Sequence, residues 1–227
     1  MMGREQAFEL DRDGARREAG LAGPLMAELC ALLSCEAQGT AGVRLVGRPK
    51  LADLLSASNA IGAHVAECFG QPARSVRAVL FDKSDDCNWA LGWHQDRTIA
   101  VAARAEADGF GPWPVKQSIQ HVEPPFAIIA GMITVRIHLD PVDEQNAPLL
   151  IALGSHRRGR VPAGEVDNVV AQSEVHACLA RPGDVWLYRT SILHASARSR
   201  TPDRRRRVLQ VDYAAQDLPA GLEWLGI

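Results

Sequence analysis

The sequence predicts a mainly β protein, a double sheet or jelly roll with helices packed on one outer face. The first reason is the order of the elements, because two helical runs come first and many short β-rich runs separated by turn residues follow. The second reason is length, because a chain of 227 residues suits a single all-β domain. We find no internal repeat and no linker, so residues 1–227 are predicted to form one domain. Its helical part spans about residues 20–70 and its β core about residues 76–214.

The N-terminal part of the chain carries the helical signals. Residues 1–20 are polar and predict a frayed arm or the start of a first helix. Pro24 is well placed to open a helix, and apolar residues recur at helical spacing from there to Cys35. A second helical run extends from Leu51 to Phe69, and Gly70 is a suitable residue to end it.

Short strands are predicted for the rest of the chain, at residues 76–81, 98–102, 126–139, 148–153, 175–179, 185–188 and 208–213. The segment 106–125 interrupts them and is rich in Gly, Pro and polar residues. Loops of this length in compact domains are often functional lids or disordered segments. This segment is therefore a candidate lid over a substrate.

The composition is that of a soluble globular protein, with 47% hydrophobic and 23% charged residues. A formal net charge of −2 gives no electrostatic reason to expect nucleic acid or an anionic membrane as a partner. No apolar stretch has the length of a spanning helix, and the charged start lacks the apolar core of a signal peptide, so we expect a cytoplasmic protein. The five cysteines form no Cys-x-x-Cys pair, and their odd number favours reduced, mostly buried thiols.

The motif Trp93-His94-Gln95-Asp96 is the first candidate for chemistry. Side chains two residues apart in an extended chain point to the same side, so His94 and Asp96 can bind one metal ion together. Taken alone, the motif is more often a solvated polar turn. His194 follows another strand-like run and supplies a third ligand, and two His with one carboxylate form the facial triad of non-haem Fe(II) sites. The other histidines are predicted to be structural or surface residues: His64, His121, His138, His156 and His176.

Four consecutive arginines, residues 204–207, precede the last predicted strand. Such a run is most often a solvated or nucleic-acid-facing patch. The strand that leaves it favours another interpretation, because Leu209, Val211 and Tyr213 form an apolar face that can pack on the helices. Strand alternation then directs Arg206 toward a more polar cavity, together with Val208 and Gln210.

Taken together, these motifs resemble the phytanoyl-CoA dioxygenase-like family of Fe(II)/2-oxoglutarate oxygenases. The resemblance covers about residues 76–214 and implies a double-stranded β-helix core. It also implies iron bound by His94, Asp96 and His194, and 2-oxoglutarate anchored by an arginine shortly after the last His. The motifs that carry it are Trp93-His94-Gln95-Asp96, Asn146-Ala147-Pro148-Leu149 running into Gly154-Ser155-His156, Pro182-Gly183-Asp184 before His194, and Arg206-Arg207-Val208-Leu209.

The resemblance also suggests which residues bind 2-oxoglutarate. In the family the anchoring arginine opens an Arg-basic-apolar-apolar strand start, and the match falls on Arg206. The loop that precedes it is one residue longer than the usual pattern, which keeps Arg205 as the alternative. Lys83 and Thr134 are further candidates to bind the co-substrate, although a surface lysine is the favoured interpretation of Lys83.

Arg136 occupies a mid-strand position at which the family commonly has an aromatic residue. A buried charge requires a partner, so one alternative is an ion pair with Asp212 or Asp140. The other is that Arg136 binds a carboxylate or phosphate of the primary substrate, which would make that substrate a small anion.

The predicted function is the hydroxylation of a small organic substrate by an enzyme that uses Fe(II), 2-oxoglutarate and O2 and releases succinate and CO2. Halogenation is less favoured, because related halogenases lack the carboxylate ligand that Asp96 provides here. The alternative from another class is a non-catalytic metal- or small-ligand-binding barrel of the same fold. Such a barrel has no need of an arginine directed at a metal cavity. The motifs specify neither the primary substrate nor an oligomeric state.

Overall fold

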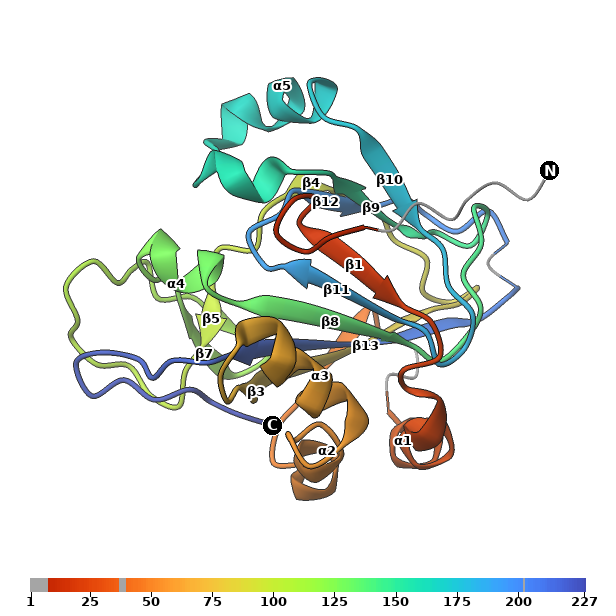
Figure 1. Cartoon of the computed structure of the whole chain (residues 1–227), viewed down its shortest axis with the longest axis horizontal. Helices are drawn as coiled ribbons and strands as arrows, with labels where there is room; N and C mark the ends of the chain where they lie inside the picture. Colours follow the sequence, from red (N-terminus) through yellow and green to blue (C-terminus); the bar gives the residue numbers. More distant parts are fainter. Residues whose placement is uncertain (1–7, 37–39, 202) are drawn as a thin grey trace.

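Two antiparallel sheets face each other in the computed structural model, which describes residues 8–36, 40–201 and 203–227 (Figure 1). The larger sheet has the order β1-β11-β8-β13-β3-β2 and the smaller sheet the order β10-β9-β12-β4. This arrangement confirms the predicted mainly β double sheet. The larger sheet consists of β1 (Ala15–Glu18), β11 (Val185–Arg189), β8 (Ile133–His138), β13 (Arg206–Ala214), β3 (Arg74–Lys83) and β2 (Gly42–Leu45). The smaller consists of β10 (Val175–Cys178), β9 (Leu149–Ala152), β12 (His194–Ser196) and β4 (Leu91–His94).

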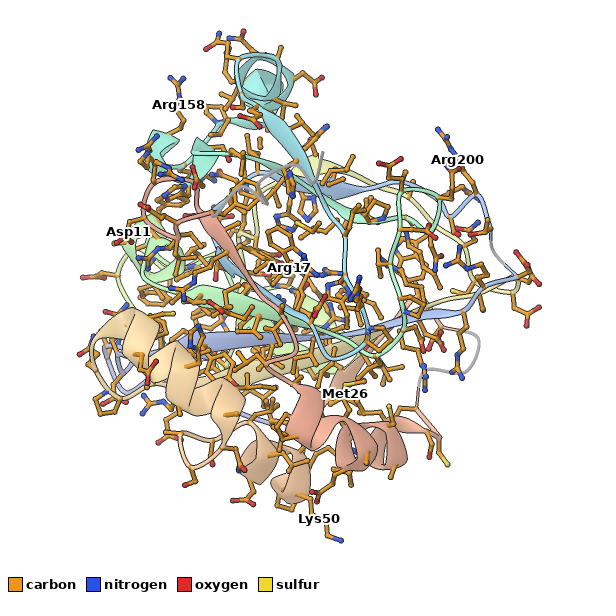
Figure 2. The ribbon with its side chains drawn as sticks, turned by 45° about the vertical axis from the view of Figure 1, so that its right-hand side comes forward. Asp11, Arg17, Met26, Lys50, Arg158 and Arg200 are labelled. Carbon is orange, nitrogen blue, oxygen red and sulfur yellow. The ribbon has the colours of Figure 1, made fainter. Side chains whose placement is uncertain are left out.

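The outer face of the larger sheet is covered by three helices, α1 (Met26–Leu33), α2 (Pro49–Leu54) and α3 (Ala60–Phe69). Figure 2 shows Met26 and Lys50 within this helical layer, away from the space between the sheets. Leu209, Val211 and Tyr213 belong to the hydrophobic core that these helices complete, and the Tyr213 hydroxyl donates to the Leu55 carbonyl at 2.8 Å. The predicted apolar face of the last strand is therefore confirmed.

The helical boundaries differ from the prediction in two places. Pro24 lies in a short 3-10 turn, Gly23–Leu25, that precedes α1. The second helical run is divided because residues 55–59 leave the helix, and the Asn59 amide donates to the Asp53 carbonyl at 2.9 Å in this break. Gly70 ends α3 in the left-handed conformation at φ 67°, which a glycine adopts without a steric penalty.

The N-terminal segment is neither a frayed arm nor a helix where the structure describes it. Residues 15–18 form β1, which pairs with β11, whereas residues 1–7 lie outside the described part of the chain. Gly14 precedes this strand at φ 80°, and a Cβ at this position would lie 2.3 Å from Nδ1 of His156. His156 is in turn hydrogen-bonded through Nε2 to the Asp11 carbonyl at 3.1 Å. The predicted structural role of His156 therefore consists of holding the N-terminal segment against the sheet.

The segment 106–125 is more regular than the prediction, and its residues Lys116 and Gln117 line the cavity between the sheets, so its role as a lid stays a prediction. It contains β6 (Val115–Lys116) and β7 (Ile119–Val122), which form a small sheet with β5 (Ile99–Ala100). The predicted strand 126–139 begins with a helix, α4 (Phe126–Ala130), which follows Pro124-Pro125. The sequence also gave no signal for β2 or for the helix α5 (Val166–Ala171), which are short elements of four and six residues.

Two composition-based expectations can be compared with the structure. Within the described ranges, no helix is long and apolar enough to cross a membrane. All five cysteines are free, but only Cys178 is fully buried, so the expectation of mostly buried thiols is wrong.

Candidate active site

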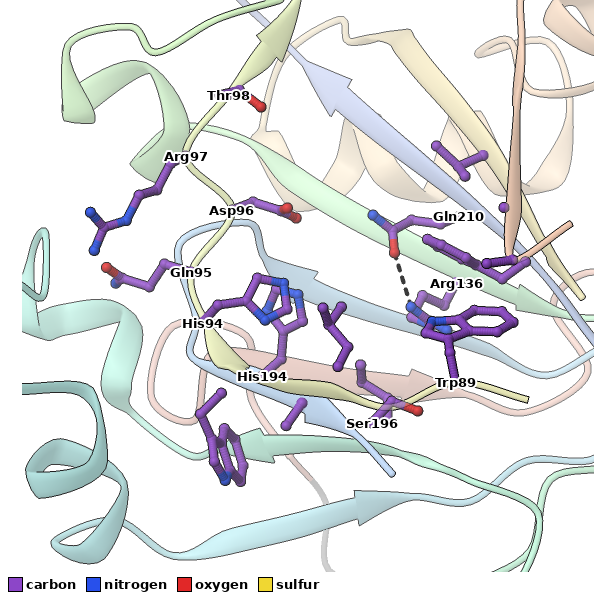
Figure 3. A pocket seen from close by; sticks show the side chains of 18 of the residues that line it. Trp89, His94, Gln95, Asp96, Arg97, Thr98, Arg136, His194, Ser196 and Gln210 are labelled. Carbon is purple, nitrogen blue, oxygen red and sulfur yellow. Dashed lines mark hydrogen bonds between the residues drawn. The ribbon is translucent and has the colours of Figure 1, made fainter. Parts of the chain in front are cut away.

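Three side chains meet at one end of the space between the sheets (Figure 3). β4 and β12 are hydrogen-bonded neighbours, and their register places His94 directly opposite His194. The two imidazole ring centroids are 4.3 Å apart. Asp96 follows two residues after His94 and points to the same side. One potential ligand atom from each of the three lies within 4.8 Å of the others, so the predicted triad is brought together.

The surroundings of the three side chains fit a metal ion. Nδ1 of His94 lies 2.8 Å from the Gly92 carbonyl, and Nδ1 of His194 lies 3.0 Å from the Ile192 carbonyl. Each Nδ1–H therefore donates to the backbone, and the lone pair of each ring is left on Nε2, as in metal-binding histidines. Oδ2 of Asp96 is buried and has no hydrogen-bond partner. Two imidazole nitrogens and one carboxylate oxygen on one side of a cavity form the donor set that suits Fe(II).

The ionisation of the triad is also suitable for a cation. Burial lowers the pKa of His194 to about 4, although the Asp96 charge opposes this shift, so the imidazole is neutral near pH 7. Burial by itself would raise the pKa of Asp96, but the charge of Arg77 is the largest opposing influence and the pKa lies below its ordinary value. The Asp96 carboxylate is therefore ionised, and the neutral His194 imidazole can act as a ligand.

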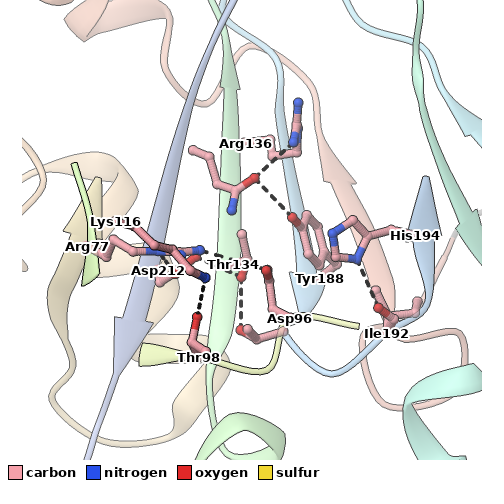
Figure 4. A network of polar contacts seen from close by, with 12 residues as sticks. Arg77, Asp96, Thr98, Lys116, Thr134, Arg136, Tyr188, Ile192, His194 and Asp212 are labelled. Carbon is pink, nitrogen blue, oxygen red and sulfur yellow. Dashed lines mark hydrogen bonds and ion pairs between the residues drawn. The ribbon is translucent and has the colours of Figure 1, made fainter. Parts of the chain in front are cut away.

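A buried network of hydrogen bonds and ion pairs lies next to Asp96 (Figure 4). Arg77 Nη2 lies 3.9 Å from Asp96 Oδ2, and Arg77 Nε donates to Asp212 Oδ2 at 2.6 Å. Thr134 donates to Asp212 Oδ1 at 3.0 Å and is hydrogen-bonded to Thr190 at 2.9 Å. Thr134 is not among the residues that line the cavity, so the structure does not support its predicted contact with 2-oxoglutarate.

Sequence reasoning missed Arg77 and assigned Asp212 to the wrong partner, Arg136. Arg77 and Asp212 are charged residues within predicted strands, where a charge without a partner is unfavourable. Two such residues in separate strands are a signal for pairing, and the register of β3 and β13 does place Arg77 opposite Asp212.

Gln95 points away from the triad and fixes the loop around it, as alternation along the strand requires. Its amide donates to the carbonyls of Ser191 at 2.7 Å and Gly159 at 3.0 Å, and it accepts a hydrogen bond from the Val161 N–H at 2.9 Å. The segment that leads to His194 is thereby tied to the segment that carries Asp96.

The triad opens into a cavity of about 670 Å³ between the two sheets. This volume is within the usual range for small-molecule sites. Seven arginines and lysines line the cavity, whereas Asp96 is the only carboxylate among the lining residues that the structure describes. The cationic residues are Arg44, Arg77, Lys83, Arg97, Lys116, Arg136 and Arg206.

Arg206 lies deep in this cavity with only 1% of its surface exposed. One guanidinium nitrogen donates to the Ala147 carbonyl at 2.6 Å, and Nε is buried without a hydrogen-bond partner. Burial and the charge of Arg136 lower the pKa of Arg206 to about 9. Arg206 therefore has donor capacity that the protein leaves unused at the position predicted for the anchor.

Lys83 is the cross-strand neighbour of Arg206 and is equally buried. Its Nζ donates to Ser196 Oγ at 3.0 Å and to the Ala197 carbonyl at 2.5 Å. Burial, followed by the charges of Arg206 and Arg136, lowers the pKa of Lys83 to about 7. The alternative of a surface lysine is wrong.

The other three arginines of the run have carboxylate partners. Arg204 pairs with Asp143, Arg205 with Asp82 and Arg207 with Asp140, at 2.6, 2.6 and 2.7 Å respectively. The side chain of Arg205 is 44% exposed and does not line the cavity. Arg205 is therefore the wrong choice for a residue that faces the cavity, because it has the strand parity of Leu209 rather than that of Arg206.

Arg136 lines the cavity, but neither predicted carboxylate is its partner. Asp212 is bonded to Arg77 and Asp140 to Arg207, so the expected ion pair is wrong. Arg136 donates instead to the side-chain carbonyl of Gln210 at 2.9 Å, and its Nε is buried without a hydrogen-bond partner. Its guanidinium lies 5.4 Å from the centre of the Phe81 ring.

Two facing sheets that hold two histidines and a carboxylate at the end of a cationic cavity define the class of non-haem iron oxygenases. A comparison with protein-family models identifies the particular family. The model described as Phytanoyl-CoA dioxygenase (PhyH) matches residues 48–208, so the chain belongs to the phytanoyl-CoA dioxygenase family. The protein is an oxygenase-type enzyme, and the cofactor and co-substrates of its family are Fe(II), 2-oxoglutarate and O2.

Solved structures show the same fold at low sequence identity. EctD from S. alaskensis with 2-oxoglutarate and 5-hydroxyectoine is 17% identical with a TM-score of 0.64, over 96% of this chain and 77% of that chain. The epimerase SnoN from nogalamycin biosynthesis, in complex with Fe3+, alpha ketoglutarate and nogalamycin RO, is 16% identical with a TM-score of 0.64, over 93% of this chain and 88% of that chain. AviO1 from Streptomyces viridochromogenes Tue57 is 20% identical with a TM-score of 0.60, over 93% and 94% of the two chains. A comparison with curated protein sequences gives no match.

Proposed function

We propose that this protein hydroxylates a small organic substrate at the expense of 2-oxoglutarate and O2, with release of succinate and CO2. The observation that carries the proposal is the presence, in one cavity, of the three potential metal ligands and of the deeply buried Arg206. A bidentate keto acid and O2 require open positions on the metal and a fixed cation for the distal carboxylate. The facial donor set and a guanidinium meet these two requirements.

In this proposal His94, Asp96 and His194 bind Fe(II), which supplies the O2 chemistry that side chains cannot perform. The backbone carbonyls of Gly92 and Ile192 orient the two imidazoles. Arg77 holds the Asp96 carboxylate ionised and in place. The presence of Asp96 favours hydroxylation over halogenation.

Arg206 is proposed to bind the distal carboxylate of 2-oxoglutarate, with Lys83 beside it. Guanidinium is suited to this role because it offers a fork of donors and keeps its charge. Arg136 lines the cavity without a carboxylate partner, so we propose that it meets an anionic group of the primary substrate.

A non-catalytic binding barrel is the second candidate that the sequence left open. The buried Arg206 indicates that an anion binds in the metal cavity, because removal of a guanidinium from water is unfavourable unless a ligand uses it. The family membership favours an oxygenase over a non-catalytic barrel.

The test is the addition of Fe(II) and 2-oxoglutarate to metal-free protein under anaerobic conditions. We expect the weak visible charge-transfer band of a metal-bound keto acid, and we expect it to be absent from the Asp96→Ala variant. Arg204→Met is the matched control with an exposed arginine, and it should retain the band. Absence of the band from the unchanged protein would overturn the oxygenase proposal.

A further inference from the structure

The mouth of the cavity carries positive charge that the proposed chemistry does not use. Arg206 and Lys83 suffice for the distal carboxylate of 2-oxoglutarate, and Arg77 is bonded to Asp212 and close to Asp96. Arg97 points away from the triad and donates to the Val161 carbonyl at 2.6 Å, and Arg136 donates to Gln210. Arg44 and Lys116 remain on the Asp96 side of the cavity, and neither has a carboxylate within ion-pair distance among the described residues. Like charges gathered in a partly buried space repel one another unless an anion joins them. The chain as a whole has a net charge of −2, so this cluster is a local feature of the site.

Arg44 shows the unused capacity most clearly. It lies on the edge strand β2, and its Nε is buried without a hydrogen-bond partner. Its side chain makes no hydrogen bond or ion pair with any residue that the structure describes. Burial and the charge of Arg77 lower the pKa of Arg44 from its ordinary value. The donors of this guanidinium are therefore available to an anionic ligand.

Lys116 is brought to the same place by the turn between β6 and β7. The Gln117 amide donates to the Gly42 carbonyl of β2 at 2.9 Å, and its side-chain oxygen accepts from the Arg44 N–H at 3.3 Å. The turn is thereby attached to the strand that carries Arg44. Lys116 points into the network beside Arg77, where Nζ donates to Thr98 Oγ1 at 2.9 Å (Figure 4). One neutral hydrogen bond leaves two ammonium donors of Lys116 for a ligand.

We infer that the primary substrate is an anion whose carboxylate or phosphate group is bound at the cavity mouth by Arg44 and Lys116. This inference rests on the proposed function, because it assigns the remaining part of the cavity to the primary substrate once 2-oxoglutarate occupies the Arg206 end. The residues that line the cavity also include Trp93 and Val166, whose side chains are largely apolar. The substrate class is therefore a small organic anion with an apolar body.

The anionic group bound by Arg44 and Lys116 is distinct from the one that Arg136 is proposed to meet, so the two sites concern different groups of the substrate. Arg136 lies in the same cross-strand row as Arg44, with Gln210 and Val79 between them. Three strand spacings correspond to about 14 Å between the two backbones. An anion held by Arg44 and Lys116 is therefore distinguishable from an anion held by Arg136.

The experiment uses phenyl phosphate and benzoate, which share an aromatic ring and differ in the charged group. Their binding to the protein loaded with Mn(II) and 2-oxoglutarate is measured by calorimetry for the unchanged protein, Arg44→Gln, Lys116→Gln and Arg158→Gln. Arg158 is an exposed arginine at the periphery of the molecule and provides the same change of charge (Figure 2). The affinity for 2-oxoglutarate and the thermal midpoint are measured in the same samples.

We expect at least one probe to bind the unchanged protein, and roughly tenfold or greater weakening in Arg44→Gln and in Lys116→Gln, because each loses a charge-assisted contact. Binding in Arg158→Gln should be unchanged, and so should the 2-oxoglutarate affinity of all three variants. Preference for one probe identifies the group as phosphate or carboxylate. Failure of both probes to bind, or equal binding in all variants, overturns the inference about Arg44 and Lys116. The proposed function is unaffected by that result if 2-oxoglutarate binds normally. Failure of 2-oxoglutarate itself to bind overturns the proposed function instead.

Discussion

The two faces of the larger sheet are built from the same strands but differ in what they contribute. On the outer face, Leu209, Val211 and Tyr213 of β13 are buried against the helices. On the inner face, the same strand presents Arg206, Gln210 and Asp212. Burial of apolar side chains stabilises the fold, whereas burial of charged groups opposes it. Strand alternation thus lets one strand support the fold on one side and a binding site on the other.

The lowered pKa values of two inner-face residues show that burial of their charges is unfavourable. Burial lowers the pKa of Lys83 to about 7 and that of Arg206 to about 9, so the surroundings disfavour the charged forms. The apolar core on the other face offsets this unfavourable burial. Substitutions on the two faces should therefore separate stability from ligand binding.

The largest expected effect on the inner side of the molecule is that of Asp96→Ala. The substitution removes one of three proposed metal ligands and should nearly abolish iron-dependent turnover and weaken Fe(II) binding. The fold should persist, because Asp96 follows β4 and belongs to no hydrophobic cluster. Fe(II) titration and 2-oxoglutarate consumption measure the first effect, and circular dichroism the second. Normal iron affinity in the variant would show that the triad is wrongly assigned.

Leu209→Ala tests the outer face. Truncation of a fully buried leucine destabilises a protein by about 2–5 kcal/mol, and Leu209 has no exposed surface. Urea unfolding should show this loss, while the affinity for 2-oxoglutarate under conditions where the variant is folded stays normal. A large change in affinity would show that the two faces are not independent.

Arg206→Met is the corresponding test of the inner face. Loss of a charge-assisted contact should weaken 2-oxoglutarate binding by about 1.5–3 kcal/mol, with little change in unfolding free energy. Arg204→Met provides the control, because exposed pairs such as Arg204–Asp143 contribute about 0–1 kcal/mol. Equal effects of the two substitutions on 2-oxoglutarate affinity would contradict the assignment of Arg206. A larger effect at Arg205 would contradict the strand parity.

Arg136→Leu sharpens the comparison within the inner face. If Arg136 meets the primary substrate, uncoupled decarboxylation of 2-oxoglutarate should persist, while binding of small anions to the co-substrate complex weakens. Lost decarboxylation would instead assign Arg136 to the co-substrate. Reduced stability with unchanged anion binding would return it to a structural role beside Gln210.

The smallest expected effect is the pH dependence introduced by Lys83. Its pKa in the folded protein is about 7, so the ammonium charge is present below this pH and is lost above it. The carboxylates of 2-oxoglutarate stay ionised throughout this range. The affinity for 2-oxoglutarate should therefore fall, by less than about tenfold, as the pH rises from about 6 to about 8. In Lys83→Met the affinity should be lower at acidic pH and should no longer depend on pH in this window. An unchanged pH profile in the variant would exclude Lys83 as the cause.

Much of the architecture could be predicted because it depends on local signals. The apolar alternation of residues 209–213 and the helical spacing around Leu29 are repeated patterns, and the structure follows both. The spacing of His94 and Asp96 likewise required only that side chains two apart share a side. His194 was predicted as the third ligand because it follows a predicted strand, and not because of its spacing from His94 or Asp96 in the sequence.

The parts that could not be predicted depend on partners far away in the sequence. β1 consists of Ala-Arg-Arg-Glu, which has little strand propensity, and it is a strand because β11 offers a free edge. Lys116 follows no motif, and it reaches the cavity only because β6 pairs with β7. The predicted partners of Arg136 were wrong for the same reason, because Arg77 pairs with Asp212 and Arg207 pairs with Asp140.

The contact of the N-terminal segment with the metal-binding region has a consequence for the order of folding. Gly14 accepts a hydrogen bond from the Arg189 N–H, and its Cα faces Ile192 in the turn just before His194. During synthesis, this segment leaves the ribosome long before β11 and β12 exist. Contacts between residues so far apart in the sequence form slowly, because the ends of a long loop must first meet. The segment that contacts Ile192 is therefore synthesised before β11 and β12 and can dock only after they have formed, so we expect the turn before His194 to become ordered late in folding.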